Sequence, residues 1–536
     1  MLHLHIMKKI VKRSLIFVLL ILSLINSQPI KAQGSLPGLN DQVNKLGQVL
    51  FLIHQYYLDT INTGLAVDEM VRTLVDQLDP HSAYIPAEDV RGMNEPLEGN
   101  FEGIGIEFAI IHDSLVVITP IAGAPSENVG IRADDRIVAV DGVEISSSEL
   151  TNQRVFSLLR GPKGTRVSLT VVRRGEDNPL YFEVIRDKIP IHSVDAAYMA
   201  APGVMYIKLN KFALTTQDEF IEAFRDLKEM PGGLILDLQG NGGGYLGAAL
   251  FLAEQFLGKG ELILYTEGRK IKRQEVTASG MGFFTNTPVV VIMDERSASA
   301  SEIVAGAIQD WDRGVIVGRR SFGKGLVQQP FPLNDGSELR LTVARYHTPS
   351  GRLIQSPYVM GEKELYYREF LERYERGESF SKDSVLIPDS LAYRTLRKNR
   401  IVYGGGGIMP DVFVPADTTY YSAFYVQLAR RGIITEFIND YLDSERERLL
   451  GMYSDFESFN KRMIPENVPF NQLIDLAATF GIVPREEELE ISGKHIRLQI
   501  KALIAARLYG TGSFYRVINP VLPEYKKALE VMNGLL

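Results

Sequence analysis

Residues 287–311 read TPVVVIMDERSASASEIVAGAIQDW, two structural patterns joined by a run of serines. The first part is an almost continuous apolar run, typical of a strand buried on both faces, and the last part has the apolar spacing of a helix. A serine at a strand-to-helix turn is exposed, and the first N–H groups of the helix favour negative charge there. A helix cap would explain one serine of the run, but not three in alternation with alanine.

Strand and helix patterns also alternate on both sides of this stretch. Such alternation, with strands that are apolar throughout, indicates a layered α/β domain. We therefore expect an α/β core over residues 188–357. Its strands are expected in GVMYIKLNKF, GGLILDLQ and GVIVGRR and in a hairpin that turns at Asp335-Gly336, and its helices in TQDEFIEAFRDLKEM and YLGAALFLAEQFL.

Three further regions surround this core. Residues 38–85 have helical periodicity that breaks at DPHSAY, and residues 98–187 contain short alternating strands, which suits a small β-rich domain. Residues 417–536 are almost wholly helical, with YVQLARRGIITEFINDYL and HIRLQIKALIAARLY as the clearest amphipathic runs. The terminal helices either pack against the core or pair with a second copy, and the pattern does not distinguish the two.

The first 32 residues predict an export signal. MKKIVKR precedes the apolar run SLIFVLLILSLI, which is shorter than the roughly 20 residues of a membrane span. Cleavage is expected near Ala32, and an uncleaved anchor in the inner membrane stays open. Residues 1–32 hold five lysines and arginines and no acidic residue, so their removal changes the net charge from −8 to −13. A chain this acidic is not expected to bind nucleic acid.

Cysteine is absent from the chain, which excludes disulfides, a thiol nucleophile and the usual structural zinc sites. None of the eight histidines lies in a metal-binding or hydrolase motif. We expect no metal and no cofactor, and a serine nucleophile would need a base other than histidine.

Lys324 is the candidate base. It lies in GRRSFGKG, residues 318–325, which differs from a phosphate-binding P-loop because Gly325 stands where that loop needs Ser or Thr. A lysine base must be neutral, and burial lowers its pKa. Flanking glycines allow close packing, and Gln328, four residues on, could hydrogen-bond the amine without adding charge. The alternative is an exposed turn lysine.

A glycine-rich turn supplies candidate oxyanion donors. DLQGNGGGYLG, residues 237–247, ends a predicted buried strand and opens a helix. Glycine permits the close backbone approach that an oxyanion hole requires. Such a turn alone is a weak signal, and it gains weight beside the serine run and Lys324.

These motifs together resemble the C-terminal processing peptidases, or tail-specific proteases, a family of Ser–Lys serine endopeptidases. The resemblance is colinear over about residues 40–357 and 404–415. It includes LDPHSAYI (78–85), FEGIGIEF (101–108), LRGPKGTRVSLTVVR (159–173), LILDLQGNGGG (234–244), SASASEIVAGAIQD (297–310), VGRRSFGKGLVQ (317–328), YHTPSGRLIQ (346–355) and GGGIMPDVFV (405–414).

The resemblance implies a crotonase/ClpP-like layered core and assigns roles by position. Ser299 would be the nucleophile, Lys324 the general base and Gln328 the residue that steadies the lysine. The oxyanion donors would be the backbone N–H groups of Gly243 and Ala300.

The chain departs from the family pattern in two places. Gln239 and Gly242 replace the usual Arg and Pro of the oxyanion turn, which makes that assignment less certain than the dyad. Residues 358–402 separate two motifs that usually lie close together, so they are an insertion, and the core is expected to resume at 403–416.

The β-rich unit at 98–187 resembles the PDZ domain of the family. Gly103, Ile104, Gly105 and Ile106 stand where PDZ domains hold a terminal carboxylate by backbone N–H groups, with the peptide added as a strand. Arg160 matches an arginine that couples PDZ position to activity in some relatives. The alternative is a β-domain that only packs.

The sequence thus predicts an exported serine endopeptidase of the periplasm or cell envelope that cleaves proteins at or near their C-terminal tails. Its partners would be proteins with unstructured apolar tails, with room for an adaptor and for a homo-oligomer through the terminal helices. The alternative function is a non-catalytic PDZ scaffold. A penicillin-binding type of Ser–Lys enzyme is weakly suggested by SFSK (379–382) and SFNK (458–461), but no K-T-G follows either.

Overall fold

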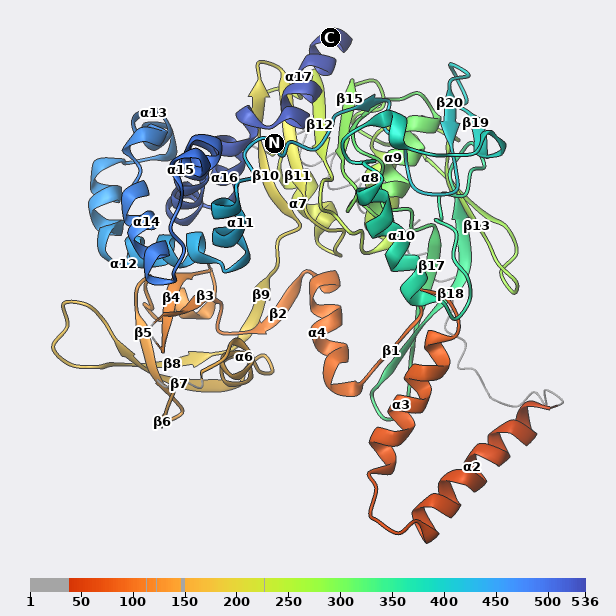
Figure 1. Cartoon of the computed structure of the whole chain (residues 1–536), viewed down its shortest axis with the longest axis horizontal. Coiled ribbons are helices and arrows are strands. Elements are labelled where there is room, and N and C mark those ends of the chain that lie inside the picture. The colour runs from red at the N-terminus through yellow and green to blue at the C-terminus, as the bar shows by residue number, and fades with distance from the viewer. Residues whose placement is uncertain (1–37, 112, 122, 146–149, 226) are drawn as a thin grey trace.

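A six-stranded sheet is the centre of the molecule (Figure 1). The computed structural model describes residues 38–111, 113–121, 123–145, 150–225 and 227–536, so the predicted export signal lies outside the described residues. The strand order is β10-β11-β12-β15-β16-β21, in which β10 is antiparallel to β11 and the others run parallel. These strands are β10 (Val194–Ala201), β11 (Val204–Leu209), β12 (Gly233–Asp237), β15 (Val289–Met293), β16 (Val315–Gly318) and β21 (Val412–Phe413).

Helices cover both faces of this sheet, which is why β15 is apolar throughout. Val289 and Val291 share one hydrophobic cluster with the helices that follow the strands in sequence. Val290 and Ile292 point the other way, into a cluster with the last helix of the chain. The helices of the first face are α7 (Thr216–Glu222), α8 (Leu246–Glu254) and α9 (Ala300–Asp310), and the last helix is α17 (Pro523–Leu535). The predicted strands and helices of the core are present, although α7 covers only the first part of the helix predicted in TQDEFIEAFRDLKEM.

The C-terminal helix α17 packs on the core rather than with the other C-terminal helices. Tyr525, Ala528 and Met532 are buried against the central sheet. The sequence pattern placed this helix in the region 417–536 because periodicity identifies a helix but not the surface it covers.

A second, five-stranded sheet lies beside the first. β18 pairs with β1, β13 and β17, and β13 pairs in turn with β14. The segment 319–325, which carries Lys324, therefore crosses from the end of β16 in the first sheet to β17 in the second. These strands are β1 (Ala83–Ile85), β13 (Leu262–Glu267), β14 (Gln274–Thr277), β17 (Leu326–Pro332) and β18 (Glu338–His347).

The β-rich unit is a separate lobe that is joined to the core by a short antiparallel pair, β2 with β9. Its sheet has the order β3-β4-β5-β7-β8, with β6 on β5, so β3 is an edge strand. Its elements are β2 (Asn100–Gly103), β3 (Ile106–Ile111), β4 (Ser114–Pro120), α5 (Pro125–Asn128), β5 (Arg136–Val140), β6 (Val143–Glu144), α6 (Asn152–Leu159), β7 (Arg166–Val172), β8 (Leu180–Ile185) and β9 (Asp187–Pro190).

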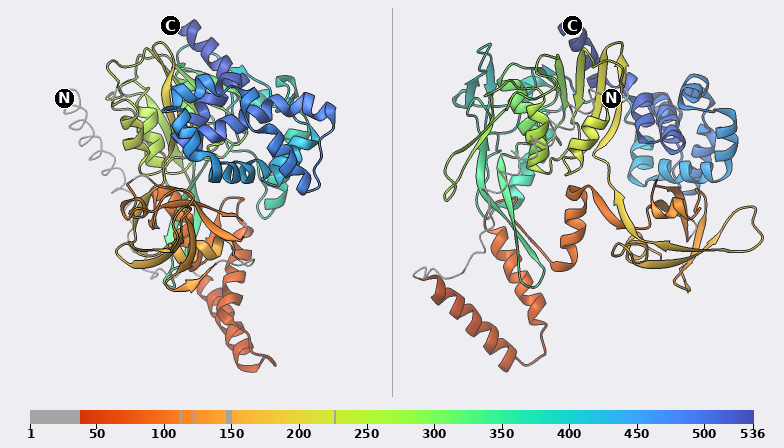
Figure 2. Two further views of the ribbon diagram at one scale, coloured as in Figure 1. Left: turned by 90° about the vertical axis from the view of Figure 1, so that its left-hand side faces the viewer. Right: turned by 180° about the vertical axis from the view of Figure 1, so that it is seen from behind.

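The C-terminal helices form a lobe that rests on the β-rich unit (Figure 2). The predicted amphipathic run at 425–442 is two helices rather than one, because Gly432 adopts a left-handed φ of 69° between them. Three ion pairs join the two lobes: Arg136–Asp443 at 3.2 Å, Arg446–Asp134 at 3.4 Å and Arg507–Glu107 at 2.6 Å. The helices are α11 (Ala423–Arg430), α12 (Ile433–Met452), α13 (Phe456–Arg462), α14 (Phe470–Thr479), α15 (Glu486–Tyr509) and α16 (Thr511–Ile518).

Two helices at the N-terminal side extend away from the body as an arm (Figures 1 and 2). They are α2 (Leu39–Tyr56) and α3 (Thr63–Asp76), followed by α4 (Ala87–Glu98), which leads to the β-rich lobe. α2 has no buried residue. Within the described ranges, no helix combines the length and apolar character that a membrane span requires.

The insertion at 358–402 contains the predicted helix. α10 (Lys363–Glu375) crosses the molecule next to β17 and β18, and a short pair of strands, β19 (Ala392–Arg394) and β20 (Ile401–Tyr403), ends the insertion. The insertion therefore lies against the crossover segment that carries Lys324.

Candidate active site

Ser299 occupies the turn between β15 and α9 in a strained backbone conformation. Its φ is 55° and its ψ is −111°, a combination that a residue with a Cβ rarely adopts and that is common at functional sites. The neighbouring serines have structural roles: Ser297 Oγ donates to Leu238 O at 2.8 Å, and Ser301 Oγ donates to Asn241 O at 2.9 Å. Of the three serines, Ser299 is the one at the turn itself.

The glycine-rich turn packs directly on Ser299. A Cβ added to Gly243, which has a φ of 101°, would lie 2.8 Å from Ser299 Cβ and 3.0 Å from the Ala300 nitrogen. Ala300 is the first residue of α9, where an N–H group has no acceptor within the helix. The Gly243 N–H, however, donates to Asn241 Oδ1 at 2.9 Å. The structure thus brings both predicted donors to Ser299, but it shows the Gly243 donor engaged.

Lys324 lies in the crossover segment with its amine on Gln328. The Lys324 Nζ donates to Gln328 Oε1 at 2.7 Å, and Gln328 Nε2 donates to His81 O at 2.5 Å. Burial lowers the pKa of Lys324 below its ordinary value, while the carboxylates of Asp79 and Glu302 oppose that shift. The alternative of an exposed turn lysine is therefore wrong.

Two buried side chains connect the backbone of Ser299 to that of Lys324. Glu302 Oε2 accepts from the Ser299 N–H at 2.8 Å and from the Lys324 N–H at 2.9 Å. The Tyr346 hydroxyl is 2.5 Å from Lys324 O and 3.2 Å from Ser299 O, so it can donate to either carbonyl. The Ser299 turn and the lysine segment thus share a donor and an acceptor, which fixes their relative position.

Glu302 is a residue that the sequence analysis missed. Its side chain is fully buried, and its other oxygen accepts from Ser321 Oγ at 2.5 Å and from the Gly323 N–H at 2.8 Å. Burial raises the pKa of Glu302 to about 7, although these donors work in the opposite direction. Its place three residues after Ser299, as in a capping box, was a signal that could have identified it.

The segment DPHSAY also reaches the site. Asp79 Oδ1 accepts from the N–H groups of His81 and Ser82 at 3.0 Å each, and from Thr342 Oγ1 on β18 at 2.9 Å. Burial and the nearby Lys324 lower the pKa of His81 to about 4, so its imidazole is neutral near pH 7. The contact of His81 with Gln328 is made by its backbone carbonyl. No periodicity in the sequence predicts this contact.

The predicted tail-binding residues lie where β2 passes into β3. Gly103, Ile104, Gly105 and Ile106 are all buried, and the Gly105 carbonyl accepts from the Ile121 N–H at 3.0 Å. The edge strand β3 that follows is unpaired on one side within its sheet. This is the arrangement to which a peptide strand can add.

Arg160 joins the β-rich lobe to α4. Its Nη1 is 2.5 Å from Glu95 Oε2, and its guanidinium lies over the rings of Phe101 and Phe156. Phe156 of α6 in turn contacts Phe108 of β3, with ring centroids 5.5 Å apart. The predicted coupling residue therefore lies between α4 and the edge strand β3, to which a peptide is predicted to add.

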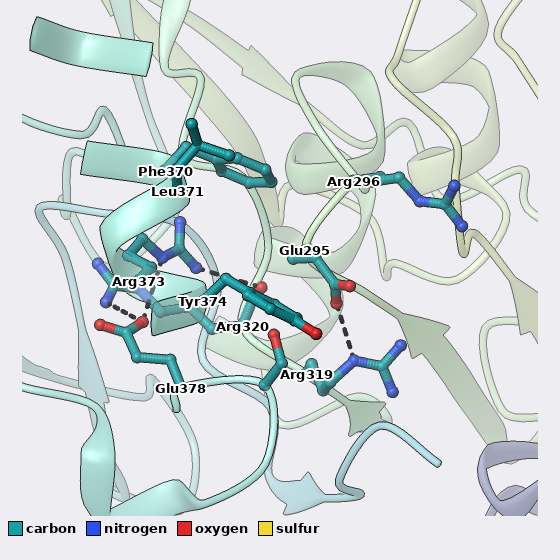
Figure 3. A pocket seen from close by; sticks show the side chains of 10 residues that line it. Glu295, Arg296, Arg319, Arg320, Phe370, Leu371, Arg373, Tyr374 and Glu378 are labelled. Carbon is teal, nitrogen blue, oxygen red and sulfur yellow. Dashed lines mark hydrogen bonds and ion pairs between the residues drawn. The ribbon is translucent and has the colours of Figure 1, made fainter. Parts of the chain in front are cut away.

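A cavity of about 230 Å³ opens between the insertion and the end of β15 (Figure 3). Phe370, Leu371 and Tyr374 of α10 line one side, and Glu295, Arg296 and Arg319 line the other. None of the predicted site residues lines it. Among the described residues there is no group of three or more His, Asp or Glu side chains arranged to hold a metal ion.

Comparison with known proteins identifies three regions of the chain. Residues 203–361 match peptidase family S41, residues 116–173 match the PDZ domain, and residues 424–510 match a family of unknown function (DUF8443). The finer prediction of a crotonase/ClpP-like core stays a prediction.

Curated relatives are carboxy-terminal processing proteases. The chain is 36% identical over 320 residues to the carboxy-terminal-processing protease of Bartonella bacilliformis, which covers 59% of this chain and 73% of the relative. It is 31% identical over 316 residues to CtpB of Bacillus subtilis, covering 58% and 65% respectively. A solved photosystem II D1 C-terminal processing protease is 26% identical, with a TM-score of 0.35, and covers 70% of this chain and 87% of that one. The chain is a serine-type protease, and it belongs to peptidase family S41 among the carboxy-terminal processing proteases.

Proposed function

We propose that the protein is an exported endopeptidase that cleaves proteins at or near their C-terminal tails, with Ser299 as nucleophile and Lys324 as general base. The observation that carries the proposal is the pair of shared contacts through Glu302 and Tyr346. They fix the nucleophile turn and the lysine segment against each other, while the lysine amine donates to a neutral amide.

The proposed reaction requires the neutral form of the Lys324 amine next to the Ser299 hydroxyl, and the lowered pKa of Lys324 favours that form. As Ser299 Oγ bonds to the substrate carbonyl carbon, its proton passes to Lys324 Nζ. The resulting ammonium gives that proton to the leaving amine as the peptide bond breaks. In the second half, water attacks the acyl-enzyme, its proton passes to the same amine, and the proton returns to Ser299 Oγ when the ester bond breaks.

The oxyanion would be held at the start of α9. The Ala300 N–H is one donor, since it stands at the helix terminus beside Ser299. The Gly243 N–H is the second donor, once it leaves Asn241 Oδ1 for the substrate oxygen. The exchange gives the Gly243 N–H a new oxygen acceptor and leaves the buried Asn241 Oδ1 without this donor.

Tail recognition is assigned to the PDZ domain. We place the substrate tail along the edge strand β3, with its carboxylate at the turn formed by Gly103, Ile104, Gly105 and Ile106. These residues are buried here, and Phe108 of β3 contacts Phe156 of α6. A tail would therefore separate β3 from α6, and it would act on Arg160, which packs on the same phenylalanine.

A single substitution tests the catalytic part of this proposal. Ser299→Ala should abolish hydrolysis of a protein with an apolar C-terminal tail, measured by mass spectrometry of the products, because no oxygen nucleophile remains. Ser379→Ala and Ser458→Ala are matched controls from the two S-x-x-K sequences and should cleave like the wild type. A wild-type rate in Ser299→Ala would contradict the proposal, and an inactive wild type would favour the scaffold alternative.

The arm supplies the proposed contact between copies. Val43, Phe51 and Tyr56 of α2 are 59%, 63% and 74% exposed, and such an apolar surface is unusual for a free helix. We assign this surface to a second copy of the chain. Light scattering should show a dimer or larger assembly that Val43→Glu with Phe51→Glu dissociates and Lys45→Glu does not. A monomeric wild type would contradict the assignment and favour an adaptor.

Export is the remaining part of the proposal. The basic and apolar start of the chain supports transport to the periplasm or cell envelope, with retention at the inner membrane if the signal is not cleaved. A fusion of residues 1–40 to a reporter that is active only outside the inner membrane should be active. An inactive fusion of normal abundance would argue against export.

A further inference from the structure

The backbone of the lysine segment is hydrogen-bonded at almost every group, although it has no regular secondary structure. Glu302 accepts from the N–H groups of Gly323 and Lys324, and Gln355 Oε1 accepts from the Gly325 N–H at 2.8 Å. The carbonyl side needs donors as well, because buried backbone carbonyls are rarely left unpaired. Ser356 and Tyr346 donate to the carbonyls of residues 322–325, and the insertion provides donors for the carbonyls of residues 320–322.

Arg373 of α10 provides donors to three consecutive carbonyls of this segment. Its Nη1 is 3.2 Å from Phe322 O, and its Nη2 is 3.1 Å from Ser321 O and 3.4 Å from Arg320 O. The residue is 7% exposed. A guanidinium is suited to this task, because its five N–H donors lie in a fixed plane.

The charge of Arg373 is balanced inside the same cluster. Its Nε is 3.1 Å from Glu378 Oε2, and the same carboxylate oxygen is 3.0 Å from Arg320 Nη1 (Figure 3). Burial and the neighbouring Arg373 lower the pKa of Arg320 to about 10. Arg376 Nη2 is 3.3 Å from the other oxygen of Glu378, so three guanidinium groups converge on one buried carboxylate, which restricts where Arg373 can lie.

The insertion also contacts the DPHSAY segment, which holds the amide partner of the base. The ring of Tyr366 packs edge-on against His81 at 5.2 Å between centroids, and Tyr367 Oη donates to Pro80 O at 3.3 Å. His81 is the residue whose carbonyl holds Gln328, the partner of the lysine amine. α10 thus touches both the backbone that carries Lys324 and the segment that orients its amide partner.

We propose that the 358–402 insertion is a positioning element for the base, and that Arg373 fixes the segment that places Lys324 beside Ser299. The inference rests on the proposed function, since it concerns the base of that reaction. Arg373 itself touches neither the nucleophile nor the lysine amine, so it is a positioning residue.

Arg373→Ala tests the proposal in steady-state peptide hydrolysis. The value of kcat should fall about 100-fold, the effect of a displacement of roughly 1 Å in a reacting group, while KM stays unchanged. A loosened segment admits water to Lys324, so the pH–rate profile should move to higher pH. Added guanidinium ion should restore part of the rate near pH 7. Arg368→Ala, an exposed position on the same helix, should match the wild type in every measurement.

Three results would overturn the inference. They are a folded Arg373→Ala with the wild-type profile, a loss of kcat without an alkaline shift, and a loss that guanidinium does not restore. If Arg373→Ala does not fold, Arg373→Lys replaces it as the test variant. Its ammonium keeps the positive charge beside Glu378 but supplies fewer fixed donors to the carbonyls. An unchanged pH–rate profile in Arg373→Lys would then refute the inference. Lys324→Met distinguishes failure of the proposed function from failure of the positioning role. If Lys324→Met keeps wild-type activity, the proposed function is refuted. If Lys324→Met is inactive and the Arg373 variants behave like the wild type, only the positioning role of Arg373 is refuted.

Discussion

Two lysines of the core differ in the partner of the amine: Lys208 contacts a carboxylate and Lys324 contacts an amide. Lys208, on β11, is 7% exposed, and its Nζ is 3.0 Å from Asp237 Oδ1 and 2.5 Å from Gln239 O. Lys324 donates instead to the neutral amide of Gln328. A carboxylate stabilises the charged amine, whereas an amide accepts a hydrogen bond without that charge preference.

The carboxylates near Lys324 are occupied by other donors. Asp79 accepts from backbone N–H groups and hydroxyls, and Glu302 accepts from three N–H groups and the Ser321 hydroxyl. Around Lys208, by contrast, the Asp237 carboxylate is bonded to the amine itself. The comparison teaches that burial alone does not make a lysine a base; the partner of its amine decides which protonation state the fold favours.

The largest expected effect is the loss of the base. Lys324→Met should lower kcat by about 10²–10⁴-fold, the usual contribution of general-base catalysis. Lys208→Met should leave the pH dependence of kcat where it is in the wild type, because that lysine takes no part in proton transfer. Stopped assays of both variants across pH measure how kcat depends on pH. An altered pH profile in Lys208→Met together with an unaltered one in Lys324→Met would contradict the assignment of Lys324 as the base.

The second effect concerns stability, with opposite signs for the two lysines. Lys208→Met leaves Asp237 as an uncompensated buried charge, so the free energy of unfolding should fall by about 3–5 kcal/mol. Asp237→Asn in the same background should recover part of that loss, since the charge disappears and an acceptor for Tyr206 remains. Denaturant titrations at pH 7 provide the measurement.

Lys324→Met should instead raise the free energy of unfolding at pH 7. The folded state lowers the pKa of Lys324, so the charged amine is less favourable in the fold than in the unfolded chain. Wild-type stability should rise with pH between the lowered pKa and the unfolded value of 10.5, and the advantage of the variant should disappear over that range. A variant that is less stable than the wild type at pH 7 would show that the amine is not disfavoured by burial.

The smallest effect comes from a change that makes the Lys324 site resemble the Lys208 site. Gln328→Glu places a carboxylate on the amine and favours its charged form, so the rate near pH 7 should fall about tenfold. The rate should recover at higher pH, where the amine loses its proton. Gln329→Glu, on the next residue of β17, is the matched control and should leave the pH profile unchanged. A tenfold loss that persists at all pH values would point to disturbed geometry rather than to the charge.

Much of this architecture could be predicted from local patterns. The apolar run at 289–293 and the helical spacing after Ser299 gave the strand and helix that the structure contains, because both depend on residues that are close in sequence. The arm helices and α10 were predicted for the same reason. Gly432, which divides one expected helix into two, shows the limit: a glycine inside a periodic run can continue a helix or end it.

The contacts around the site were less accessible to local patterns. Tyr346, His81 and Arg373 come from a strand, a loop and an insertion. His81 and Tyr346 belong to motifs of the family resemblance, but no local pattern indicates that the three residues contact the Lys324 segment or its amide partner. The resemblance to a family supplied Ser299, Lys324 and Gln328 as candidates, but it did not indicate what holds them. The packing of α17 on the core is a similar case, since its apolar stripe fits any complementary surface.

The sequence by itself determined the alternation of strands and helices, the absence of cysteine chemistry, and the presence of a serine run at a strand-to-helix turn and of a glycine-flanked lysine. Only the tertiary structure decided that the lysine amine meets an amide while the nearby carboxylates bond to backbone N–H groups and hydroxyls. The reason is physical: secondary structure follows from periodicities over a few residues, whereas the protonation preference of a buried amine depends on groups that meet only when distant segments pack together.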